Sequence, residues 1–351
     1  MTLRIAIIGA GIGAQHLDAL RTLPDLFQVT LICDRDVARA QGIAGDIPVV
    51  AEIDAVLASD VDLVDICLPP HLHVPVAVQA LSAGKHVVCE KPLACSLADI
   101  DRLEAAAEQA GRQVFPVFQY RYGPAMDQLR ALGAAGLLGT PFVASLETHW
   151  NRGADYYAVP WRGTWAGEQG GAVLGHAIHM HDLISTVMGP VAEVGGVLAT
   201  RVNPIETEDC AALSFVLGSG ALVTSSVTLG AADDRSRMRL VFADLTAESD
   251  TLPYAPMQGR WTFTARRPEQ QTAIDDALAA VVPGQPGYVG YFADIASALA
   301  GQANTAVDLA AGRASVELVT AIYGAPRKGR RVSLPLGRTD LLYSGWTPEA
   351  Q

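Results

Sequence analysis

The sequence is poor in cysteine, in basic residues relative to acidic ones, and in long apolar segments, and each shortage excludes a class of protein. Its five cysteines are an odd number, and no Cys-x-x-Cys pair occurs. This usage indicates buried, reduced thiols and argues against a disulfide framework or a zinc site. The cysteines are Cys33, Cys67, Cys89, Cys95 and Cys210.

The charge balance excludes polyanionic partners. Lys and Arg number 25 against 37 Asp and Glu, so the formal net charge is −12. Such a chain repels phosphate backbones and anionic lipid, so we expect neither nucleic acid nor a membrane surface as a partner. The amino terminus lacks a signal-peptide pattern, and the longest uncharged stretch, 210–232, is broken by Gly218-Ser219-Gly220. We therefore predict a β-hairpin there and a cytoplasmic protein.

Strand and helix patterns alternate over the first 120 residues. Short apolar runs predict strands, and segments with helical spacing predict the helices between them. This alternation predicts an α/β Rossmann domain with a doubly wound parallel sheet over residues 1–122. The predicted strands are 3–8, 27–33, 63–68, 86–89 and 113–118, and the predicted helices are 11–23, 73–83 and 96–109.

The pattern changes after about Tyr122. Strand-like segments dominate, and only two strong helical signals follow, at 288–299 and 308–323. Consecutive strands with few helices between them predict an α+β domain with a large, mostly antiparallel open sheet and helices on one face, over residues 123–351. The predicted strands are 141–150, 191–200, 210–217, 221–228 and 238–243.

A glycine-rich turn joins the first predicted strand to the first helix. Gly9, Gly11, Ile12 and Gly13 lie in a G-x-G-x-x-G/A pattern whose third position is Ala14. In this pattern the first glycine permits a tight turn, the second admits a pyrophosphate, and the third residue lets the helix pack closely on the strand. A glycine-rich turn can also serve packing alone, but the flanking strand and helix favour dinucleotide binding.

The second predicted strand ends at Asp34, 25 residues after Gly9. A carboxylate there can accept hydrogen bonds from both ribose hydroxyls and would repel a 2′-phosphate, which favours NAD. The adjacent Arg35 would tolerate NADP, so NADP remains the alternative cofactor, and a turn aspartate is the structural alternative for Asp34.

Glu90-Lys91-Pro92 follows the predicted strand 86–89. Parallel sheets bind ligands at the carboxyl ends of their strands, so Lys91 is placed where it can hold a substrate hydroxyl. A solvated turn lysine is the alternative.

A histidine cluster follows Gly170-Gly171. His176 and His179 share a helix face, and His181 and Asp182 come next. A metal site is the alternative for this cluster, but His181 would point away from the shared face and no distant ligand is evident. We expect a substrate site and no metal.

Taken together, the sequence resembles the Gfo/Idh/MocA family of glucose–fructose oxidoreductase and inositol 2-dehydrogenase-like oxidoreductases. The resemblance covers nearly the whole chain and depends on the joint order of several motifs. They are the turn 9–14, Leu68-Pro69-Pro70-His71-Leu72-His73, Glu90-Lys91-Pro92, Tyr120-Arg121-Tyr122-Gly123-Pro124, Trp161-Arg162, the segment Gly170–Asp182, and the stretch Asp308–Tyr323.

This resemblance implies hydride transfer between nicotinamide and a carbinol carbon of a sugar, polyol or glycoside, in a homodimer or homotetramer packed through the open sheet. It implies that Lys91 and His179 are the catalytic pair, facing the same nicotinamide carbon. By the same resemblance, Leu68, Pro70, His73, Glu90 and Gln119 border the cofactor, together with Lys91.

The resemblance has one departure. Many family members carry an aspartate four residues before the catalytic histidine, and Gly175 stands there in this chain. Either His176 replaces that aspartate in holding a substrate hydroxyl, or the acid–base chemistry rests on His179 and Lys91 alone.

An aromatic and charged segment supplies the remaining substrate candidates. Aromatic faces stack on sugar rings and charged groups hold hydroxyls, although aromatic residues also fill cores. The candidates are Arg121, Tyr156, Trp161 and Arg162, with Tyr288 as a further residue. Two other functions remain open: a glycosidase that uses NAD transiently, and a non-catalytic dinucleotide-binding regulator.

Overall fold

The computed structural model describes residues 2–348, which divide into two compact units. Unit 1 comprises residues up to Gln119 together with Tyr288–Val316, and unit 2 comprises Tyr120–Gly287 and the residues from Glu317 onward. Helix α11 belongs to both. Across the described residues, no helix has the length and apolar composition needed to cross a bilayer.

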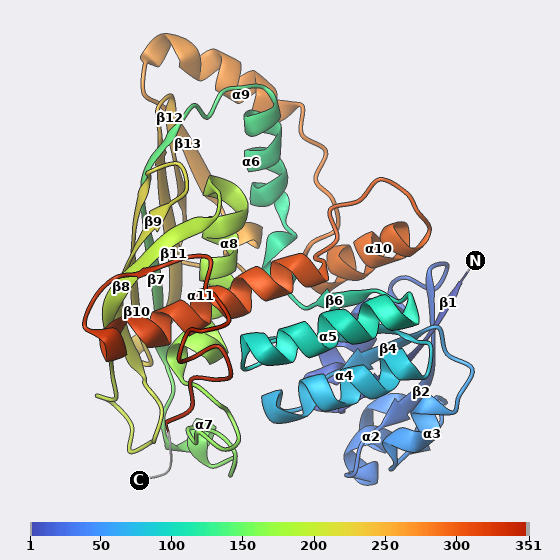
Figure 1. The fold of residues 1–351 in the computed structure, drawn as a ribbon. Helices are drawn as coiled ribbons and strands as arrows, with labels where there is room; N and C mark the ends of the chain where they lie inside the picture. Colours follow the sequence, from blue (N-terminus) through green and yellow to red (C-terminus); the bar gives the residue numbers. More distant parts are fainter. Residues whose placement is uncertain (1, 349–351) are drawn as a thin grey trace. The chain divides into compact units, whose positions relative to one another are not determined.

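Unit 1 contains a six-stranded parallel sheet in the order β3-β2-β1-β4-β5-β6 (Figure 1). This is the doubly wound order, whose direction reverses between β1 and β4. The elements are β1 (Leu3–Ile8), α1 (Gly13–Arg21), β2 (Phe27–Cys33), α2 (Val37–Ala44), β3 (Val49–Val50), α3 (Ile53–Leu57), β4 (Leu63–Ile66), η1 (Pro70–Leu72), α4 (His73–Ser82), β5 (His86–Cys89), α5 (Leu97–Ala110), β6 (Val114–Pro116) and α10 (Gly287–Leu299). The short helix η2 (Gln119–Arg121) begins in unit 1 and ends in unit 2.

The central strands of this sheet are apolar on both faces because helices cover both. Ile5, Ile7, Val64 and Ile66 are all fully buried, as continuous strand burial in a parallel sheet requires. Helix α5 is capped by Ser96, whose hydroxyl accepts a hydrogen bond from the Asp99 N–H at 3.0 Å. The predicted parallel domain is thereby confirmed, and Ser96 and Asp99 stand at capping-box spacing at this helix start.

Unit 2 contains an eight-stranded sheet in the order β13-β12-β11-β7-β10-β9-β8-β14. Every neighbouring pair is antiparallel except β10 with β7. Its elements are α6 (Pro124–Ala134), β7 (Pro141–Asn151), α7 (Ala154–Tyr157), the π-helix η3 (Val173–Ala177), α8 (Ile178–Met188), β8 (Val191–Ala199), β9 (Cys210–Leu217), β10 (Leu222–Thr228), β11 (Gly230–Phe242), β12 (Leu245–Ser249), η4 (Pro256–Gln258), β13 (Trp261–Ala265), η5 (Pro268–Gln270), α9 (Gln271–Ala279), α11 (Leu309–Lys328) and β14 (Val332–Ser333).

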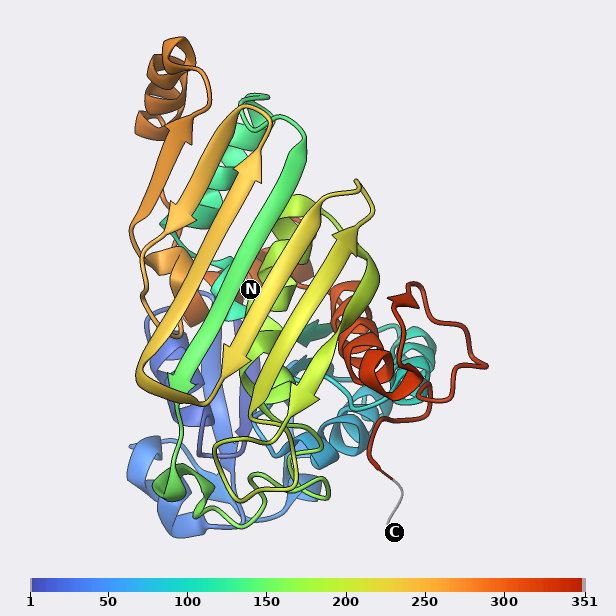
Figure 2. The ribbon, with the colours of Figure 1, turned by 90° about the vertical axis from the view of Figure 1, so that its left-hand side faces the viewer.

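The large sheet has one covered face and one open face. Along β7 and β10, buried residues alternate with half-buried and exposed ones, as expected when only one face meets a core. Figure 2 looks onto the open face, over which no helix of the described part of unit 2 lies. The predicted mostly antiparallel sheet with helices on one face is confirmed.

The structure differs from the predicted elements in several places. Strand β11 begins at Gly230, eight residues before the predicted start, and α6, α9, β12 and β13 had no predicted counterpart. Residues 288–316, predicted within the second domain, pack in unit 1. Tyr291 Oη donates to the Phe115 carbonyl at 2.9 Å, and Arg313 pairs with Asp101 and Glu104 at 2.8 Å. These long-range contacts, which no local pattern encodes, draw the segment into unit 1.

Gly9 gives a test of the strand–helix turn. Its φ is +105°, and a Cβ there would lie 2.3 Å from the Cys67 carbonyl oxygen. Gly9→Ala should therefore lower the free energy of unfolding by about 3 kcal/mol, measured by urea denaturation. Gly42→Ala in α2 is the matched control, since no atom lies within 4 Å of its added Cβ. The control should be neutral or slightly stabilising, and equal stabilities of the two variants would contradict the interpretation.

Candidate functional site

The glycine-rich turn fits a dinucleotide. Gly9 lies against β4, whereas Gly11 is exposed and has no atom within 4 Å of the place a Cβ would occupy. No side chain caps the first turn of α1, so its N–H groups can meet phosphate oxygens. The close helix–strand contact occurs at Gly13, whose added Cβ would lie 2.8 Å from Ile7. The sequence pattern did not single out Gly13 for this contact, and the expected close packing of Ala14 stays a prediction.

Asp34 follows β2 and is bound to this turn. Its Oδ2 accepts a hydrogen bond from the Ala10 N–H at 2.8 Å, and its Oδ1 accepts from the Asp36 N–H at the same distance. Each carboxylate oxygen has a second lone pair, so ribose hydroxyls could still bind. Arg35 is exposed, and Ile12 is half-buried. The Asp34 carboxylate thus fixes the glycine-rich turn through Ala10 and keeps lone pairs that a ribose hydroxyl can use.

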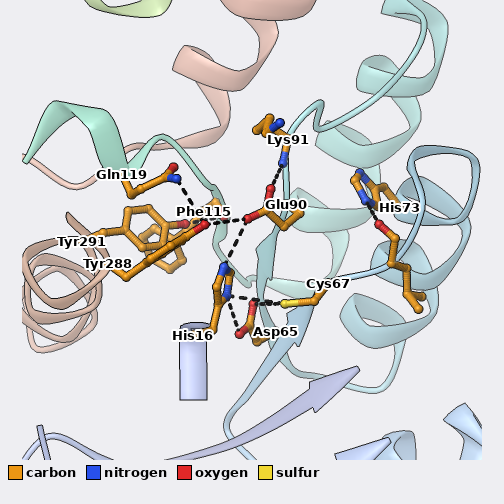
Figure 3. Close-up of polar contacts among 11 residues, drawn as sticks. His16, Asp65, Cys67, His73, Glu90, Lys91, Phe115, Gln119, Tyr288 and Tyr291 are labelled. Carbon is orange, nitrogen blue, oxygen red and sulfur yellow. Dashed lines mark hydrogen bonds and ion pairs between the residues drawn. The ribbon is translucent and has the colours of Figure 1, made fainter. Parts of the chain in front are cut away.

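The Lys91 segment is held by its neighbours at the carboxyl end of β5 (Figure 3). Glu90 is 6% exposed, and its Oε2 accepts a hydrogen bond from the Lys91 N–H at 3.0 Å. The Lys91–Pro92 peptide bond is cis. A buried carboxylate needs such donors, so the backbone that carries Lys91 is fixed on one side by Glu90.

His73 braces the other side of this segment. It is fully buried, with Nδ1 2.7 Å from the Pro92 carbonyl and Nε2 2.7 Å from the Leu68 carbonyl. Burial lowers the pKa of His73, while the two carbonyl hydrogen bonds act in the opposite direction. The ring therefore links the Leu68–Pro70 segment to the Lys91 segment, and its contact with a cofactor stays a prediction.

Gln119 and Tyr288 complete this group. Gln119 Nε2 donates to Tyr288 Oη at 3.1 Å, and Tyr288 Oη donates to Glu90 Oε1 at 3.4 Å. The sequence pattern did not single out His16, which contacts Glu90 from α1 at 3.1 Å. Its position one helical turn after Gly11–Ile12 was the available signal, since such a residue faces the sheet end where Glu90 lies.

In unit 2, His179 and His176 lie at the start of the helix pair η3–α8. His179 is 3% exposed and stacks on Tyr120, with ring centroids 4.1 Å apart and planes at 17°. His176 is also buried and lies against Trp150 and Tyr156, at centroid distances of 5.2 and 5.6 Å. The sequence predicted both histidines on one helical face, whereas the π-helical turn before α8 changes that register.

Glu208 holds the start of this helix. Its carboxylate accepts hydrogen bonds from the Gly171 N–H at 3.2 Å, the Val173 N–H at 3.0 Å and Tyr323 Oη at 3.0 Å. An added Cβ at Gly171 would lie 1.8 Å from the Glu208 carbonyl oxygen. Glycine is thus required where the chain passes Glu208 before entering η3. Sequence reasoning missed Glu208, because no local pattern pairs it with residues more than 30 positions earlier.

His181 and Asp182 have separate partners. His181 Nε2 lies 2.9 Å from Ser225 Oγ, and burial lowers its pKa to about 3, so the ring is neutral. Asp182 forms a two-point ion pair with Arg121, at 2.8 and 2.5 Å. Burial raises the pKa of Asp182, and Arg121 opposes this shift. Arg121 therefore anchors the segment that carries Tyr120, and its contact with a substrate stays a prediction.

The predicted substrate segment packs on itself. The Arg162 guanidinium lies 3.8 Å from the Tyr156 ring centroid and 4.9 Å from that of Trp161. Burial raises the pKa of Tyr156 to about 12, so its hydroxyl stays protonated. Near them, Glu168 is 6% exposed and accepts a hydrogen bond from the Gly163 N–H at 2.6 Å. These polar groups could hold sugar hydroxyls.

The doubly wound sheet and its glycine-rich turn define a dinucleotide-binding protein with a second, open-sheet unit. A sequence profile described as an oxidoreductase family with an NAD-binding Rossmann fold matches residues 3–118, and the GFO/IDH/MocA C-terminal domain matches residues 126–247. The chain belongs to the Gfo/Idh/MocA family, and NAD is its cofactor.

Similar sequences include other oxidoreductases. An uncharacterized oxidoreductase of Synechocystis sp. is 29% identical over 71% of this chain and 72% of its own. Inositol 2-dehydrogenase of Rhodococcus erythropolis is 39% identical, over 40% of this chain and 42% of its own length. The match to that enzyme spans less than half of either chain.

Among solved structures, the WlbA dehydrogenase of Chromobacterium violaceum, in complex with NADH and UDP-GlcNAcA, is 29% identical with a TM-score of 0.85. The match covers 96% of this chain and 97% of that one. A levoglucosan dehydrogenase in complex with NADH and levoglucosan is 20% identical with a TM-score of 0.80, over 96% of this chain and all of the other, and shows the shared fold.

Glu208 gives a pH-dependent test of the helix start. Burial raises the pKa of Glu208 to about 7 from its ordinary value of 4.5. Between these values the folded chain keeps a proton that the unfolded chain releases, so stability should fall as the pH rises from about 4.5 to 7. Relative to Glu208→Gln, which cannot titrate, wild type should lose up to about 3 kcal/mol across that window.

Urea denaturation of both proteins at several pH values between 4.5 and 8 measures this difference. Glu206→Gln, at an exposed carboxylate two residues earlier, is the matched control. Parallel stability curves for wild type and Glu208→Gln would show that the carboxyl keeps its ordinary titration.

Proposed function

We propose that this protein is an NAD-dependent dehydrogenase that oxidises a CH–OH group of a sugar, polyol or glycoside, with Lys91 and His179 acting on the same hydroxyl. The observation that carries the proposal is the arrangement around Lys91. Its backbone is fixed at the carboxyl end of β5 by Glu90 and, through Pro92, by His73, in the same sheet whose first turn fits a dinucleotide.

NAD, when bound at the glycine-rich turn, supplies the hydride acceptor. Lys91 holds the substrate hydroxyl and stabilises the negative charge that develops on its oxygen. As the C–H bond breaks and its electron pair leaves as hydride, the hydroxyl proton passes to the imidazole of His179. The carbinol becomes a carbonyl, and one hydride and one proton account for the two hydrogens removed.

Gly175 stands where many family members carry an aspartate, and the carboxylate of Glu168 lies close to this position. A Cβ at position 175 would lie 3.5 Å from Glu168 Oε1, so Glu168 places a carboxylate where an aspartate side chain from residue 175 would extend. We infer that Glu168 and His176 together hold a neighbouring substrate hydroxyl, and that His179 and Lys91 carry the proton chemistry.

The substrate class is favoured by structures of similar proteins. The WlbA dehydrogenase complex contains UDP-GlcNAcA, and several relatives are inositol 2-dehydrogenases. A screen with NAD and NADP should therefore include inositols, aldoses, sugar acids, glycosides and nucleotide-linked sugars. Net NADH formation supports the dehydrogenase. Release of free sugar without net NADH would identify a glycosidase, and cofactor binding without turnover would identify a regulator.

Lys91→Ala and His179→Ala test the roles assigned to the two side chains. With a substrate from the screen, each should reduce kcat by about 100-fold or more, because each removes a group that acts on the reacting hydroxyl. NAD affinity, measured by fluorescence titration, should change much less. Lys85→Ala is the matched control, since Lys85 Nζ donates to the Ser59 carbonyl and has no part in the proposed chemistry. Full activity in Lys91→Ala would refute the assignment.

We also propose that the open sheet face packs against a second copy of the chain. Neighbouring apolar side chains remain exposed there, with Val143 at 46% and its strand partner Leu222 at 55%. Val197 on β8 is 62% exposed. Exposed apolar side chains on the open face, two of them paired across neighbouring strands, favour a partner surface.

Leu222→Glu should weaken this association, because it places a charge at the centre of an apolar contact. Light scattering after gel filtration should then show the wild type as a dimer or tetramer and the variant shifted toward the monomer. Thr262→Glu on β13, near the edge of the sheet, serves as the control. A wild-type monomer at micromolar concentration would exclude the proposed assembly.

A further inference from the structure

His16 lies in unit 1 between two carboxylates, and the proposed reaction does not use it. It is fully buried in the first part of α1, directly after the glycine-rich turn. Its Nδ1 is 2.8 Å from Asp65 Oδ2, and its Nε2 is 3.1 Å from Glu90 Oε1 (Figure 3). Asp65 is fully buried, and the Glu90 side chain is 7% exposed. Three elements, α1, β4 and β5, therefore meet at one imidazole.

The geometry favours the charged ring. A neutral imidazole donates from only one nitrogen and would set a lone pair against the second carboxylate, whereas an imidazolium donates to both. Burial opposes the charge, but Asp65 and the neighbouring groups outweigh it and raise the pKa of His16 well above its ordinary value. One cation thus lies between two buried anions, an arrangement in which loss of the cation leaves uncompensated charge.

The groups facing His16 come from three elements. Asp65 faces it from β4, Cys67 from the residue after β4, and Glu90 from the residue after β5. The Tyr288 ring faces it from α10 at a centroid distance of 4.4 Å. Burial raises the pKa of the Cys67 thiol to about 12. The protonated thiol donates to Asp65 Oδ1 at 3.6 Å.

The side-chain donor atoms of His16, Asp65 and Cys67 lie within 4.8 Å of one another. A metal ion would have to displace the proton of the Cys67 thiol, whose pKa burial raises to about 12. The separations between these groups are those of hydrogen bonds. The cluster is therefore a buried hydrogen-bond network, and its charged members are His16, Asp65 and Glu90.

Glu90 connects this network to Lys91. One of its oxygens accepts from His16, and the other accepts from the Lys91 N–H at 3.0 Å. A continuous path therefore runs from α1, whose first turn meets the dinucleotide phosphates in the proposed function, to the backbone that carries Lys91.

We propose that His16 is a positioning residue: its imidazolium, fixed by Asp65, orients the Glu90 carboxylate and thereby the backbone from which Lys91 extends. This inference rests on the proposed function only for the role of Lys91 in turnover. The position of Lys91 can be measured without a substrate, so the two ideas can fail separately.

The chain's lysines are only Lys85, Lys91 and Lys328, which makes lysine labelling a direct probe. Trace acetylation of the full-length protein, read by mass spectrometry of peptides, gives a rate for each lysine with and without NAD. In His16→Gln, we expect the acetylation rate at Lys91 to change by about threefold or more. The Glu90 carboxylate, without its His16 partner, no longer fixes the backbone of Lys91 in one conformation. The rates at Lys85 and Lys328 should match those of wild type and act as internal standards.

The double variant His16→Gln/Asp65→Asn separates charge from shape. It removes one anion together with the cation, so the network returns from two uncompensated negative charges to one, as in wild type, and the Lys91 rate should return toward wild type. A merely steric role for His16 predicts no such rescue. If His16→Gln does not fold, the double variant and Glu90→Gln give the same measurement, and Glu90→Gln should alter the Lys91 rate alone.

Turnover provides the second measurement. With a substrate from the screen, His16→Gln should lower kcat by about tenfold or more while KM changes less, because misplacing a catalytic group slows the chemical step. Partial recovery in the double variant is expected. His86→Gln is the matched control, since His86 Nδ1 accepts from the Gln113 N–H at 3.0 Å and lies at the start of β5.

Unchanged Lys91 labelling in His16→Gln, or a double variant no closer to wild type than the single one, would overturn the inference. Altered labelling in His16→Gln together with unchanged turnover in Lys91→Ala would leave the positioning intact and refute the proposed function instead.

Discussion

Glu90 cannot be buried at the end of β5 without donors, because an unpaired carboxylate in a protein interior loses several kcal/mol of hydration. The chain supplies these donors from His16, from Tyr288 and from the Lys91 backbone. Since each comes from a different part of unit 1, satisfying one carboxylate fixes α1, α10 and the Lys91 segment relative to one another. The loop that carries Lys91 has no regular secondary structure, so its geometry depends on this constraint.

In unit 2 a buried carboxylate, that of Glu208, also fixes a loop by accepting hydrogen bonds from backbone N–H groups. The chain enters η3 through Gly171, and the Glu208 carboxylate binds the N–H groups of Gly171 and Val173. The donors are the free N–H groups that every helix start leaves, so the carboxylate acts as a cap supplied from a distant strand connection. His176 and His179 follow within two turns. In both units, a buried acid fixes the backbone from which a candidate catalytic side chain extends.

The regular elements of both units were predictable because their information is local. Strands 3–8, 27–33, 86–89 and 210–217 agree with β1, β2, β5 and β9 residue for residue, since apolar runs and turn residues define them. The glycine-rich turn was predictable for the same reason, although the close contact at Gly13 was not. The motif gives residue types, and the tertiary contact with Ile7 decides which of them needs to be small.

The long-range partners were not predictable. Nothing local to residue 16 shows that Asp65 and Glu90 will lie on either side of it, and nothing local to residue 208 points to Gly171. The placement of residues 288–316 in unit 1 is of the same kind, because it depends on Tyr291 and Arg313 reaching residues more than 170 positions earlier. Such pairings become visible only once the sheet order is known.

At Gly175, where the family resemblance leads one to expect an aspartate, a carboxylate from seven residues earlier lies close by. A side chain at 175 would extend toward Glu168 Oε1, only 3.5 Å from its Cβ. An aspartate there would bring two carboxylates together in a buried region, which is unfavourable unless one is protonated. Glycine at 175 is therefore compatible with glutamate at 168, and the region holds one buried carboxylate. Position 175 alone suggests that the carboxylate is absent, whereas in the folded chain Glu168 places a carboxylate next to this position.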